Sequence, residues 1–297
     1  MENQHRCGFI AIVGRPNVGK STLLNRLIGQ KVSITSRRAQ TTRHRIMGIK
    51  TMPTYQAVYV DTPGLHHGGK KAMNRYLNRA AQSAMTDVDG LLFVVEGLKW
   101  TDEDDLVLQR LQNIGSPVIL VINKVDQVDK TALLTHIASL AKRRDFAAIV
   151  PLSARSGDNI EALESEVHQR LPHSPPMFPE EQISDRSDRF LAAEIVREKL
   201  TRRLGQELPH ALTVEINSFK ERDKAIHIDA VIWVERDSQK AIVIGKDGIG
   251  MKTVGQQARH DLEHLFGQHV FIRLWVKVKA QWANDERSLR SLGYQDE

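Results

Sequence analysis

The stretch FIAIVGRPNVGKS, residues 9–21, decides the fold of this 297-residue chain. An apolar run of strand length ends at Val13, and a glycine-rich loop with the spacing GxxxxGKS leads from Gly14 to Ser21 into a helical pattern. Such glycines let successive backbone N–H groups converge on phosphate oxygens at the start of a helix. The stretch therefore predicts a phosphate-binding loop, in which the Lys20 ammonium reaches phosphate and the Ser21 hydroxyl binds Mg²⁺. The residues expected to contact the nucleotide here are Gly14, Arg15, Pro16, Asn17, Val18, Gly19, Lys20, Ser21 and Thr22.

Short apolar runs alternate with longer amphipathic stretches over the first 170 residues. Runs such as AVYVD (57–61) and PVILVIN (117–123) have the length of buried strands, and stretches such as TALLTHIASLAKRR (131–144) have helical spacing. This alternation predicts an α/β fold, with a mostly parallel sheet covered by helices on both faces. It ends at four prolines between Pro172 and Pro179, which cannot continue a helix and indicate a linker.

Beyond the prolines the order of the expected elements changes. A helical stretch from about residue 188 to 204 precedes two strand-like runs, ALTVEINSF (211–219) and AIHIDAVIWV (225–234). A last strand, HVFIRLWVKVK (269–279), follows further helical sequence, so the expected order is α-β-β-α-α-β, an α+β domain. We therefore expect a first domain over residues 1–172, a linker over 173–184, a second domain over 185–280 and a C-terminal tail over 281–297.

The composition is that of a folded, water-soluble protein, and its charge is unevenly placed. Lys and Arg number 42 against 36 Asp and Glu. The stretch from Lys31 to Lys50 has basic residues and no acidic one, which favours a polyanionic partner, although solvated basic faces are common. The lone Cys7 excludes an internal disulfide and a cysteine-built zinc site. No apolar run approaches the ~20 residues of a membrane span and no secretory signal is recognisable, so we expect a cytoplasmic protein.

A second motif, Asn123-Lys124-Val-Asp126, directly follows a buried run, at the carboxyl end of a strand, where open α/β sheets bind ligands. The Asp126 carboxylate can accept both N1–H and N2–H of guanine, a pairing that adenine cannot offer. Ser153 and Ala154 end another strand-like run, and the backbone there can face guanine O6. The motif therefore favours guanine as the base, with Asn123, Lys124, Asp126, Ser153 and Ala154 as its expected contacts.

Between these two motifs, the run AVYV ends in Asp61-Thr62-Pro63-Gly64. The Asp61 carboxylate can hold Mg²⁺ through water, and the Gly64 N–H can meet a γ phosphate and sense its loss. DxxG alone is a weak signal. Four motifs in the order phosphate loop, DTPG, NKVD and SA together predict that the chain binds GTP.

With these motifs the chain resembles the translation-factor-like GTPases, and within them the Era family, in the stretches GRPNVGKSTLLN, RRAQTTRHR, DTPGLH, NKVD and SAR. The resemblance implies hydrolysis of GTP to GDP and phosphate. It also implies that Thr42, with its neighbour Thr41 as the alternative, joins Mg²⁺ when the γ phosphate is present. The expected metal ligands are Ser21, Thr42 and Asp61, and the residues expected to carry catalysis are Lys20, Thr42 and Gly64.

Two further features bear on hydrolysis. Leu65 stands where many GTPases place the glutamine that orients the attacking water, so we expect slow intrinsic hydrolysis. His66 is more simply interpreted as a surface histidine than as a base. By resemblance to potassium-stimulated GTPases, Asn17 implies a K⁺ ion at the phosphates, and turn formation is its alternative role.

In the second domain, Gly245-Lys246-Asp247-Gly248 forms a GxxG loop between two helical stretches. Set in the α-β-β-α-α-β order, the loop is similar to that of a type II KH domain, which clamps backbone nucleotides of RNA. An ordinary helix–turn–helix with a glycine cap is the alternative. The glycines permit close approach to phosphate, while Asp247 lowers the local positive charge. The expected RNA-binding residues are Gly245, Lys246, Asp247, Gly248, Lys252, Arg273, Lys277 and Lys279.

The resemblance to the Era family then covers the whole chain, as a P-loop GTPase domain followed by a KH domain. It implies binding near the 3′ end of small-subunit (16S) ribosomal RNA and a role in assembly and maturation of the small ribosomal subunit. Two alternatives stay open. One is a GTPase coupled to RNA modification, and the other is a peripheral switch on the inner face of the cell membrane, whose basic helix at residues 188–204 meets anionic lipids. The chain is expected to act as a monomer.

Overall fold

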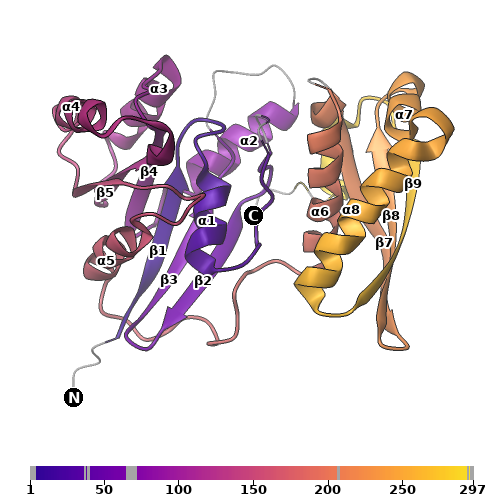
Figure 1. The fold of residues 1–297 in the computed structure, drawn as a ribbon, viewed down its shortest axis with the longest axis horizontal. Helices are drawn as coiled ribbons and strands as arrows, with labels where there is room; N and C mark the ends of the chain where they lie inside the picture. The colour runs from indigo at the N-terminus through magenta and orange to yellow at the C-terminus, as the bar shows by residue number, and fades with distance from the viewer. Residues whose placement is uncertain are drawn as a thin grey trace. The chain divides into compact units, whose positions relative to one another are not determined.

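The computed structural model describes residues 5–36, 38, 41–64, 72–205, 208–292 and 294, and the chain divides into two compact units (Figure 1). The first unit consists of Met1–Ser33, Thr42–Gly68 and Leu77–Asp185. The second consists of Ile34–Thr41, Gly69–Tyr76 and Arg186–Glu297. The expectations for Leu65 and His66 lie outside the described residues.

A mostly parallel sheet forms the centre of the first unit, in the strand order β2-β3-β1-β4-β5-β6. Its one antiparallel pairing within the described residues joins β2 to β3, and the other neighbours run parallel. The apolar runs of the sequence are thus central strands, as their length predicted. The strands are β1 (Arg6–Val13), β2 (Ile46–Met52), β3 (Tyr55–Asp61), β4 (Gly90–Glu96), β5 (Val118–Asn123) and β6 (Ala148–Pro151).

Helices cover both faces of this sheet. On one face α2 (Ala72–Ser83), α3 (Asp102–Leu111) and α4 (Lys130–Leu140) enclose an apolar core with alternate residues of β1, β4 and β5. The other face carries α1 (Lys20–Ile28) and α5 (Ile160–Arg170), which both contact β3 (Figure 1). The predicted α/β fold class is confirmed.

The second unit holds a three-stranded sheet among the described residues, with α6 and α8 packed on one face. The central strand β8 pairs antiparallel with β7 and parallel with β9. Alternate residues of all three strands face the helices, and the intervening residues face away. In chain order the elements are α6 (Asp188–Arg203), β7 (Leu212–Arg222), β8 (Ala225–Val234), α7 (Asp237–Ile244), α8 (Ile249–Phe266) and β9 (His269–Val278), which is the predicted α-β-β-α-α-β order.

The C-terminal tail is folded onto the second unit. After β9, a short turn and the helix α9 (Glu286–Ser291) follow, and Asp285 caps this helix. Trp282 is fully buried and its indole N–H donates to the carbonyl of Ala211 over 3.2 Å. The Tyr294 hydroxyl lies 2.9 Å from Thr213 Oγ1. The sequence predicted only a tail here because these few apolar residues form no periodic pattern.

The proline-rich stretch lies against the first unit. The buried side chain of Gln56 on β3 accepts the N–H groups of Met177 and Phe178 at 2.8 and 3.0 Å, and donates to the Phe178 carbonyl at 2.9 Å. Further along, Ser184 Oγ donates to the carbonyl of Met47 over 2.8 Å. The segment expected as a linker is therefore held by hydrogen bonds, and the expected domain boundaries at residues 172, 184 and 280 stay predictions.

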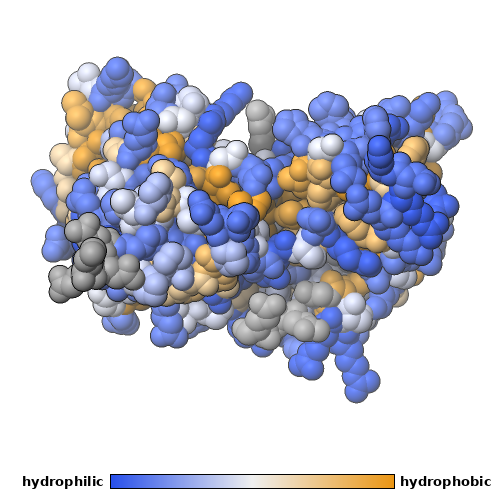
Figure 2. Space-filling model, turned by 90° about the horizontal axis from the view of Figure 1, so that it is seen from below, coloured by the Kyte–Doolittle hydropathy of each residue, from blue (hydrophilic) through white to orange (hydrophobic). Residues whose placement is uncertain are grey.

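Hydrophilic residues dominate the face of the molecule seen in Figure 2, and apolar residues show between them in smaller areas. Among the described residues, several large apolar side chains are exposed in the second unit, namely Ile242, Ile249, Phe271 and Trp275. Exposed apolar side chains that cluster commonly mark an interaction surface. Within the described residues, no helix combines the length and the apolarity that a bilayer crossing requires.

Candidate functional site

The loop between β1 and α1 passes very close to the carboxyl ends of β4 and β5. Gly19 has a φ of +106°, and a Cβ there would lie 2.2 Å from Asn123 Nδ2. Gly14 has a φ of +152°, and a Cβ there would lie 2.4 Å from the carbonyl oxygen of Val94. Only glycine suits both the backbone conformation and the space at these positions. The phosphate loop therefore lies at the edge of the sheet where open α/β folds bind ligands.

Lys20 is a buried cation inside this loop, with 6% of its surface exposed. Its Nζ donates to the carbonyl oxygens of Gly14 and Arg15, each over 2.9 Å. Burial lowers the pKa of Lys20 to about 8, although the nearby charge of Asp61 opposes the change. A buried ammonium whose hydrogen bonds go to neutral oxygens is suited to receive an anionic phosphate.

The three expected metal ligands come together beside Lys20. Ser21 Oγ donates to Asp61 Oδ2 over 2.7 Å, and Thr42 Oγ1 lies 2.8 Å from Ser21 Oγ. Ser33 also donates to Asp61 Oδ2, over 3.0 Å. Ser33 belongs to none of the four motifs, so no spacing in the sequence pointed to it.

The buried carboxylate of Asp61 has one oxygen without a hydrogen-bond partner among the described residues. Asp61 is fully buried, burial raises its pKa, and its Oδ1 has no hydrogen-bond partner among the described residues. Carboxylate and hydroxyl oxygens are ligands that Mg²⁺ prefers. Residues Ser21, Thr42 and Asp61 therefore fit a Mg²⁺ ion. Thr41, the alternative to Thr42, instead places its hydroxyl 2.6 Å from Ser36 Oγ.

The DTPG turn follows β3 directly and abuts the phosphate loop. Thr62 Oγ1 donates to the carbonyl of Ile12 over 3.0 Å, so this side chain fixes the turn to β1. Pro63 is buried beside it. A Cβ on Gly64 would lie 2.9 Å from the backbone nitrogen of Pro16. The backbone at Gly64 therefore lies against the loop that is expected to bind the phosphates.

Asn123 connects the phosphate loop to the expected guanine site. Its Nδ2 donates to the carbonyl of Val18 over 2.8 Å. Its Oδ1 accepts the N–H groups of Lys124 and Ala154 at 2.8 and 3.0 Å. The side chain is buried at the end of β5. The NKVD and SA motifs, 30 residues apart, are thereby brought together at one point.

Lys124 and Asp126 belong to the NKVD motif, where the base is expected. Lys124 Nζ donates to the carbonyl of Asn17 over 3.0 Å and so lies along the phosphate loop. Asp126 is exposed. The Ser153 hydroxyl lowers the pKa of the Asp126 carboxyl, which keeps this group an ionised acceptor at neutral pH. An exposed, charged acceptor can recognise paired N–H donors.

Two carboxylates outside the motifs, Glu96 and Asp104, hold the phosphate loop to β4 and α3 through Arg15. Arg15 Nη2 lies 2.7 Å from Glu96 Oε2, and Arg15 Nε lies 3.1 Å from Asp104 Oδ2. Glu96 Oε1 also contacts Lys124 Nζ at 3.0 Å. Burial would raise the pKa of Glu96, but hydrogen bonds from Lys124 and Arg15 hold it below its ordinary value. The guanidinium of Arg15, expected at the nucleotide, points to these carboxylates, so its contribution to the loop is positional.

In the second unit the GxxG loop joins α7 to α8. Gly245 and Gly248 have φ values of +72° and +73°, and Asp247 has +51°. A Cβ on Gly245 would lie 3.1 Å from the backbone nitrogen of Gly250. Lys246 and Asp247 are exposed. The loop therefore turns sharply and exposes Lys246 and Asp247, the part of the loop where contact with RNA phosphates is predicted.

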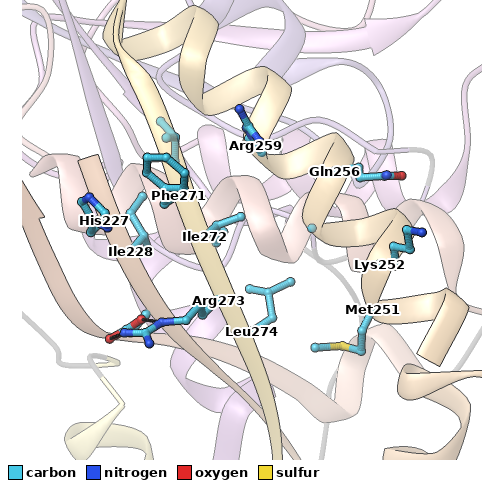
Figure 3. Close-up of a pocket in the computed structure, with 13 residues that line it drawn as sticks. His227, Ile228, Met251, Lys252, Gln256, Arg259, Phe271, Ile272, Arg273 and Leu274 are labelled. Atoms are coloured by element: carbon cyan, nitrogen blue, oxygen red, sulfur yellow. Dashed lines mark hydrogen bonds and ion pairs between the residues drawn. The ribbon is translucent and has the colours of Figure 1, made fainter. Parts of the chain in front are cut away.

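A cavity of about 620 Å³ lies between α8 and the edge strand β9 (Figure 3). Lys252 and Arg273, both expected to bind RNA, line this cavity. Lys277 and Lys279 lie farther along the chain, where Lys277 Nζ is 5.9 Å from the Trp233 ring centroid and Lys279 Nζ is 3.2 Å from Ser291 Oγ. The cavity also has apolar walls, which the sequence analysis did not identify. These walls include Met251, Phe271, Ile272 and Leu274.

Comparison with known proteins shows which families the two parts of the chain match. Residues 9–124 match the family described as 50S ribosome-binding GTPase, and residues 207–283 match the KH domain family. The chain is 57% identical to GTPase Era of Pseudomonas syringae pv. tomato, over 98% of this chain and 97% of that protein. It is 55% identical to GTPase Era of Marinobacter nauticus, over 99% of this chain and 96% of that protein.

Two solved structures match nearly the whole chain. A variant of Aquifex aeolicus Era bound to GDP and AlF₄⁻ has a TM-score of 0.95 and 38% identity, and covers 98% of this chain and 100% of its own. Era in complex with MgGDPNP and nucleotides 1506–1542 of 16S ribosomal RNA gives the same four values. The fold class and the family that the motifs predicted are confirmed. The chain belongs to the Era family of GTPases, with a GTPase domain followed by a KH domain.

Proposed function

We propose that this protein is a GTP-hydrolysing switch that binds the 16S ribosomal RNA of the small subunit through its KH domain and acts in assembly of that subunit. The observation that carries the GTPase part is the meeting of Lys20, Ser21, Thr42 and Asp61 at one edge of the sheet. The RNA part is supported by the cavity beside the GxxG loop and by the related Era structure that contains 16S ribosomal RNA nucleotides.

In this proposal each motif has one task in binding and hydrolysis. Backbone N–H groups of the phosphate loop bind the phosphates, and the Lys20 ammonium offsets their charge. Bound Mg²⁺, held by Ser21, Thr42 and Asp61, supplies electrostatic stabilisation of charge that develops on the phosphate oxygens. The Gly64 N–H contacts the terminal phosphate. Positioning and electrostatics dominate phosphoryl transfer, so a slow intrinsic rate follows where no side chain orients the water.

Recognition of guanine rests on Asp126 and on the backbone at Ala154. The ionised Asp126 carboxylate accepts both guanine donors, and the Ala154 N–H lies near the side chain that also holds the phosphate loop. Base and phosphate recognition are thus joined through Asn123. Asn17 holds a K⁺ ion at the phosphates in this proposal, and hydrolysis that runs equally fast in K⁺ and Na⁺ would exclude that role.

The GTPase part is tested with Lys20→Ala, measured by GTP binding and phosphate release with Mg²⁺. We expect both to be lost, because a buried cation at the phosphates is removed. Lys142→Ala is the matched control, since Lys142 is exposed on the same unit. Hydrolysis that survives Lys20→Ala at the rate of the unmodified protein would exclude the proposed role of the phosphate loop.

The RNA part is tested with Gly248→Asp, measured by gel shift on the 16S ribosomal RNA fragment of nucleotides 1506–1542. A carboxylate placed against RNA phosphate should abolish binding and leave basal GTP hydrolysis intact. Gly267→Asp is a close control, because Gly267 and Gly248 have φ values of +65° and +73° and neither has atoms within 4 Å of an added Cβ. Equal RNA affinity of the two variants would contradict the proposal.

We propose action in the cytoplasm as a monomer. The membrane alternative depended on basic side chains of α6, but two of these are occupied. Arg197 and Lys199 are buried, and they pair with Glu194 and Asp261 respectively. A buried, paired cation is not available to lipid headgroups.

A further inference from the structure

One face of the sheet in the second unit points away from α6 and α8 and carries aromatic rings. On β9 this face presents Phe271 and Trp275, which are 53% and 43% exposed. On β8 it presents His227 and Trp233. The C-terminal segment covers one end of the face, where Tyr294 meets Thr213 on β7. Phe271 and Trp275 on β9 are therefore open to solvent, whereas on β8 Val231 is buried and Trp233, the register partner of Thr213, is half-buried.

Cations alternate with these rings along β9. His227 and Phe271 are register partners, and their rings stack with centroids 4.9 Å apart and an interplanar angle of 20°. The Arg273 guanidinium comes next, 5.6 Å from the centroid of Trp275. Lys277 then lies over Trp233. Aromatic rings and cations therefore alternate along β9 on this face.

The spacing of these positions suits nucleic acid bases. Successive residues on one face of a strand lie about 6.6 Å apart, at roughly 3.3 Å per residue. Stacked bases rise by about 3.4 Å, so two bases that hold one ring between them are about 6.8 Å apart. A single strand of RNA laid along β9 could therefore place its bases between successive side chains of this face. Such stacking tolerates any base sequence.

The face is continuous with the cavity beside α8. His227, Phe271 and Arg273 line that cavity and also belong to the face. Figure 3 shows the rings of His227 and Phe271 side by side at the cavity, with Arg273 pointing toward the same face. Trp275 and Trp233 lie outside the cavity lining. A chain that leaves the cavity around β9 would meet them next.

The charges on the face favour stacking over phosphate attraction. Arg273 makes a two-point ion pair with Asp229, at 2.7 and 3.0 Å. The Trp233 indole N–H donates to Glu215 over 2.7 Å. These carboxylates neutralise part of the positive charge. A ligand of this face must therefore gain its affinity mainly by stacking flat rings on the aromatic side chains. The bases of single-stranded RNA are such rings.

We propose that the open sheet face formed by His227, Phe271, Trp275 and Trp233 is a second RNA surface, on which bases of the single strand that leaves the cavity stack. This inference rests on the proposed function, because the cavity must bind RNA first. It adds Trp275 and Trp233 to the RNA site, and neither residue belongs to a sequence motif or to the GxxG loop.

The test compares RNAs of two lengths. Fragments of decreasing length from 16S ribosomal RNA nucleotides 1506–1542 are tested first. They identify the shortest RNA that binds the unmodified protein and does not bind Gly248→Asp. That RNA is then lengthened by about four nucleotides, at the 5′ end in one arm and at the 3′ end in the other. We expect one of the two extensions to raise affinity about fivefold to hundredfold, the range for one or more stacked bases. The same extension should quench the emission of Trp275.

Variants at Trp275 separate stacking from bulk apolarity. Trp275→Leu should remove the gain from the extension and leave the short RNA unaffected, whereas Trp275→Phe should keep most of the gain because it retains a ring. The slope of affinity against salt should not change in Trp275→Leu, since no phosphate contact is lost. Leu134→Ala, at a side chain that is 68% exposed in the first unit, is the control for loss of a surface apolar residue.

The outcomes distinguish the two proposals. If no fragment binds the unmodified protein in a way that Gly248→Asp abolishes, the proposed function fails. If the short RNA binds but neither extension adds affinity, or Trp275→Leu keeps the gain, the proposed function stands and this inference is overturned. Sedimentation that shows a dimer of the unmodified protein, lost in Trp275→Leu, would assign the face to a second copy of the chain and would also overturn it.

Discussion

The side-chain amide of Asn123 lies 2.8 Å from the carbonyl oxygen of Val18, and this one contact ties the base-recognition motif to the phosphate loop. The same side chain accepts the backbone N–H of Ala154. Because Asn123 is only 3% exposed, water does not compete for these bonds. A residue of a base-recognition motif therefore also fixes the geometry of the site around it.

Asn123→Ala should weaken GTP binding and destabilise the fold. The change leaves the Val18 carbonyl and the Ala154 N–H buried without a partner, and each such group costs about 1–3 kcal/mol. Titration calorimetry with GTP and urea unfolding measure the two effects. Asn113→Ala, at an exposed asparagine, should change neither. An unchanged GTP affinity of Asn123→Ala would show that GTP binding does not depend on the hydrogen bonds of the Asn123 side chain.

Asp126→Asn should move base preference from guanine toward xanthine. The amide replaces one acceptor by a donor, which suits the xanthine carbonyl at C2 and leaves the guanine N2–H facing another donor. Competitive binding of GTP and XTP to the variant and to the unmodified protein measures the change. A variant that keeps the original preference for GTP would mean that Asp126 does not contact the base.

Lys20 should make the stability of the nucleotide-free protein depend on pH. Its pKa falls from 10.5 to about 8 on burial, so the unfolded chain binds more protons between these values and stability rises with pH there. Below about pH 8 both states carry the charge, and the full cost, on the order of 3 kcal/mol, is present.

Lys20→Met should therefore raise the free energy of unfolding at pH 7 and remove part of the rise between pH 8 and 10.5. Urea unfolding of both proteins at pH 7 and pH 10 measures the difference. The same variant should lose GTP binding, which separates the two roles of the lysine. If the free energies of unfolding of the two proteins changed with pH in the same way, burial of the Lys20 charge would not have the assigned cost.

Asp104→Ala should destabilise the first unit by about 3–5 kcal/mol, because it leaves the buried Arg15 without one of its charged partners. It also removes the acceptor for the Thr101 backbone N–H at the start of α3. A double-mutant cycle with Arg15→Met separates these effects through the coupling energy. Additive changes in the cycle would mean that the ion pair contributes nothing.

RNA affinity should differ between the GTP and GDP states. Thr42 lies beside Ser21 and Asp61, where γ phosphate and Mg²⁺ would hold it in the proposed site, and it directly follows a segment that groups with the second unit. Titration of RNA into protein loaded with a non-hydrolysable GTP analogue, and with GDP, measures the difference. RNA must then change nucleotide affinity by the same factor. Equal affinities in both states would mean that the domains act independently.

The fold was predictable where local patterns are strong. Apolar runs of five to seven residues became central strands, and GxxxxGKS and NKVD lie at their carboxyl ends, because the chain order of α/β units largely determines the sheet. Gln56 could not be identified in this way. Its amide lies within an apolar stretch, and its partners at residues 177 and 178 are more than 120 positions away.

The motifs account for most of the candidate site, and the residues that were missed, Ser33, Glu96 and Asp104, belong to no motif. Arg15 lies in the phosphate loop, but its partner Asp104 is 89 residues away, and no spacing rule connects the two before the fold is known. Ser33 likewise reaches Asp61 from a loop without periodicity. Trp275 was within a strand pattern that the sequence showed, but which of its faces lacks a covering helix depends on how α6 and α8 pack.

The contacts of the proline-rich stretch set the length of the chain that connects this stretch to α6. Ser184 and Asp185 still hydrogen-bond Met47, and α6 begins at Asp188. The backbone between Asp185 and Asp188 spans at most about 11 Å, at roughly 3.6 Å per residue. This connection has few rotatable bonds, so it leaves little chain entropy to change. A glycine–serine insert there would replace it by a random coil whose end-to-end distance grows with the length of the insert.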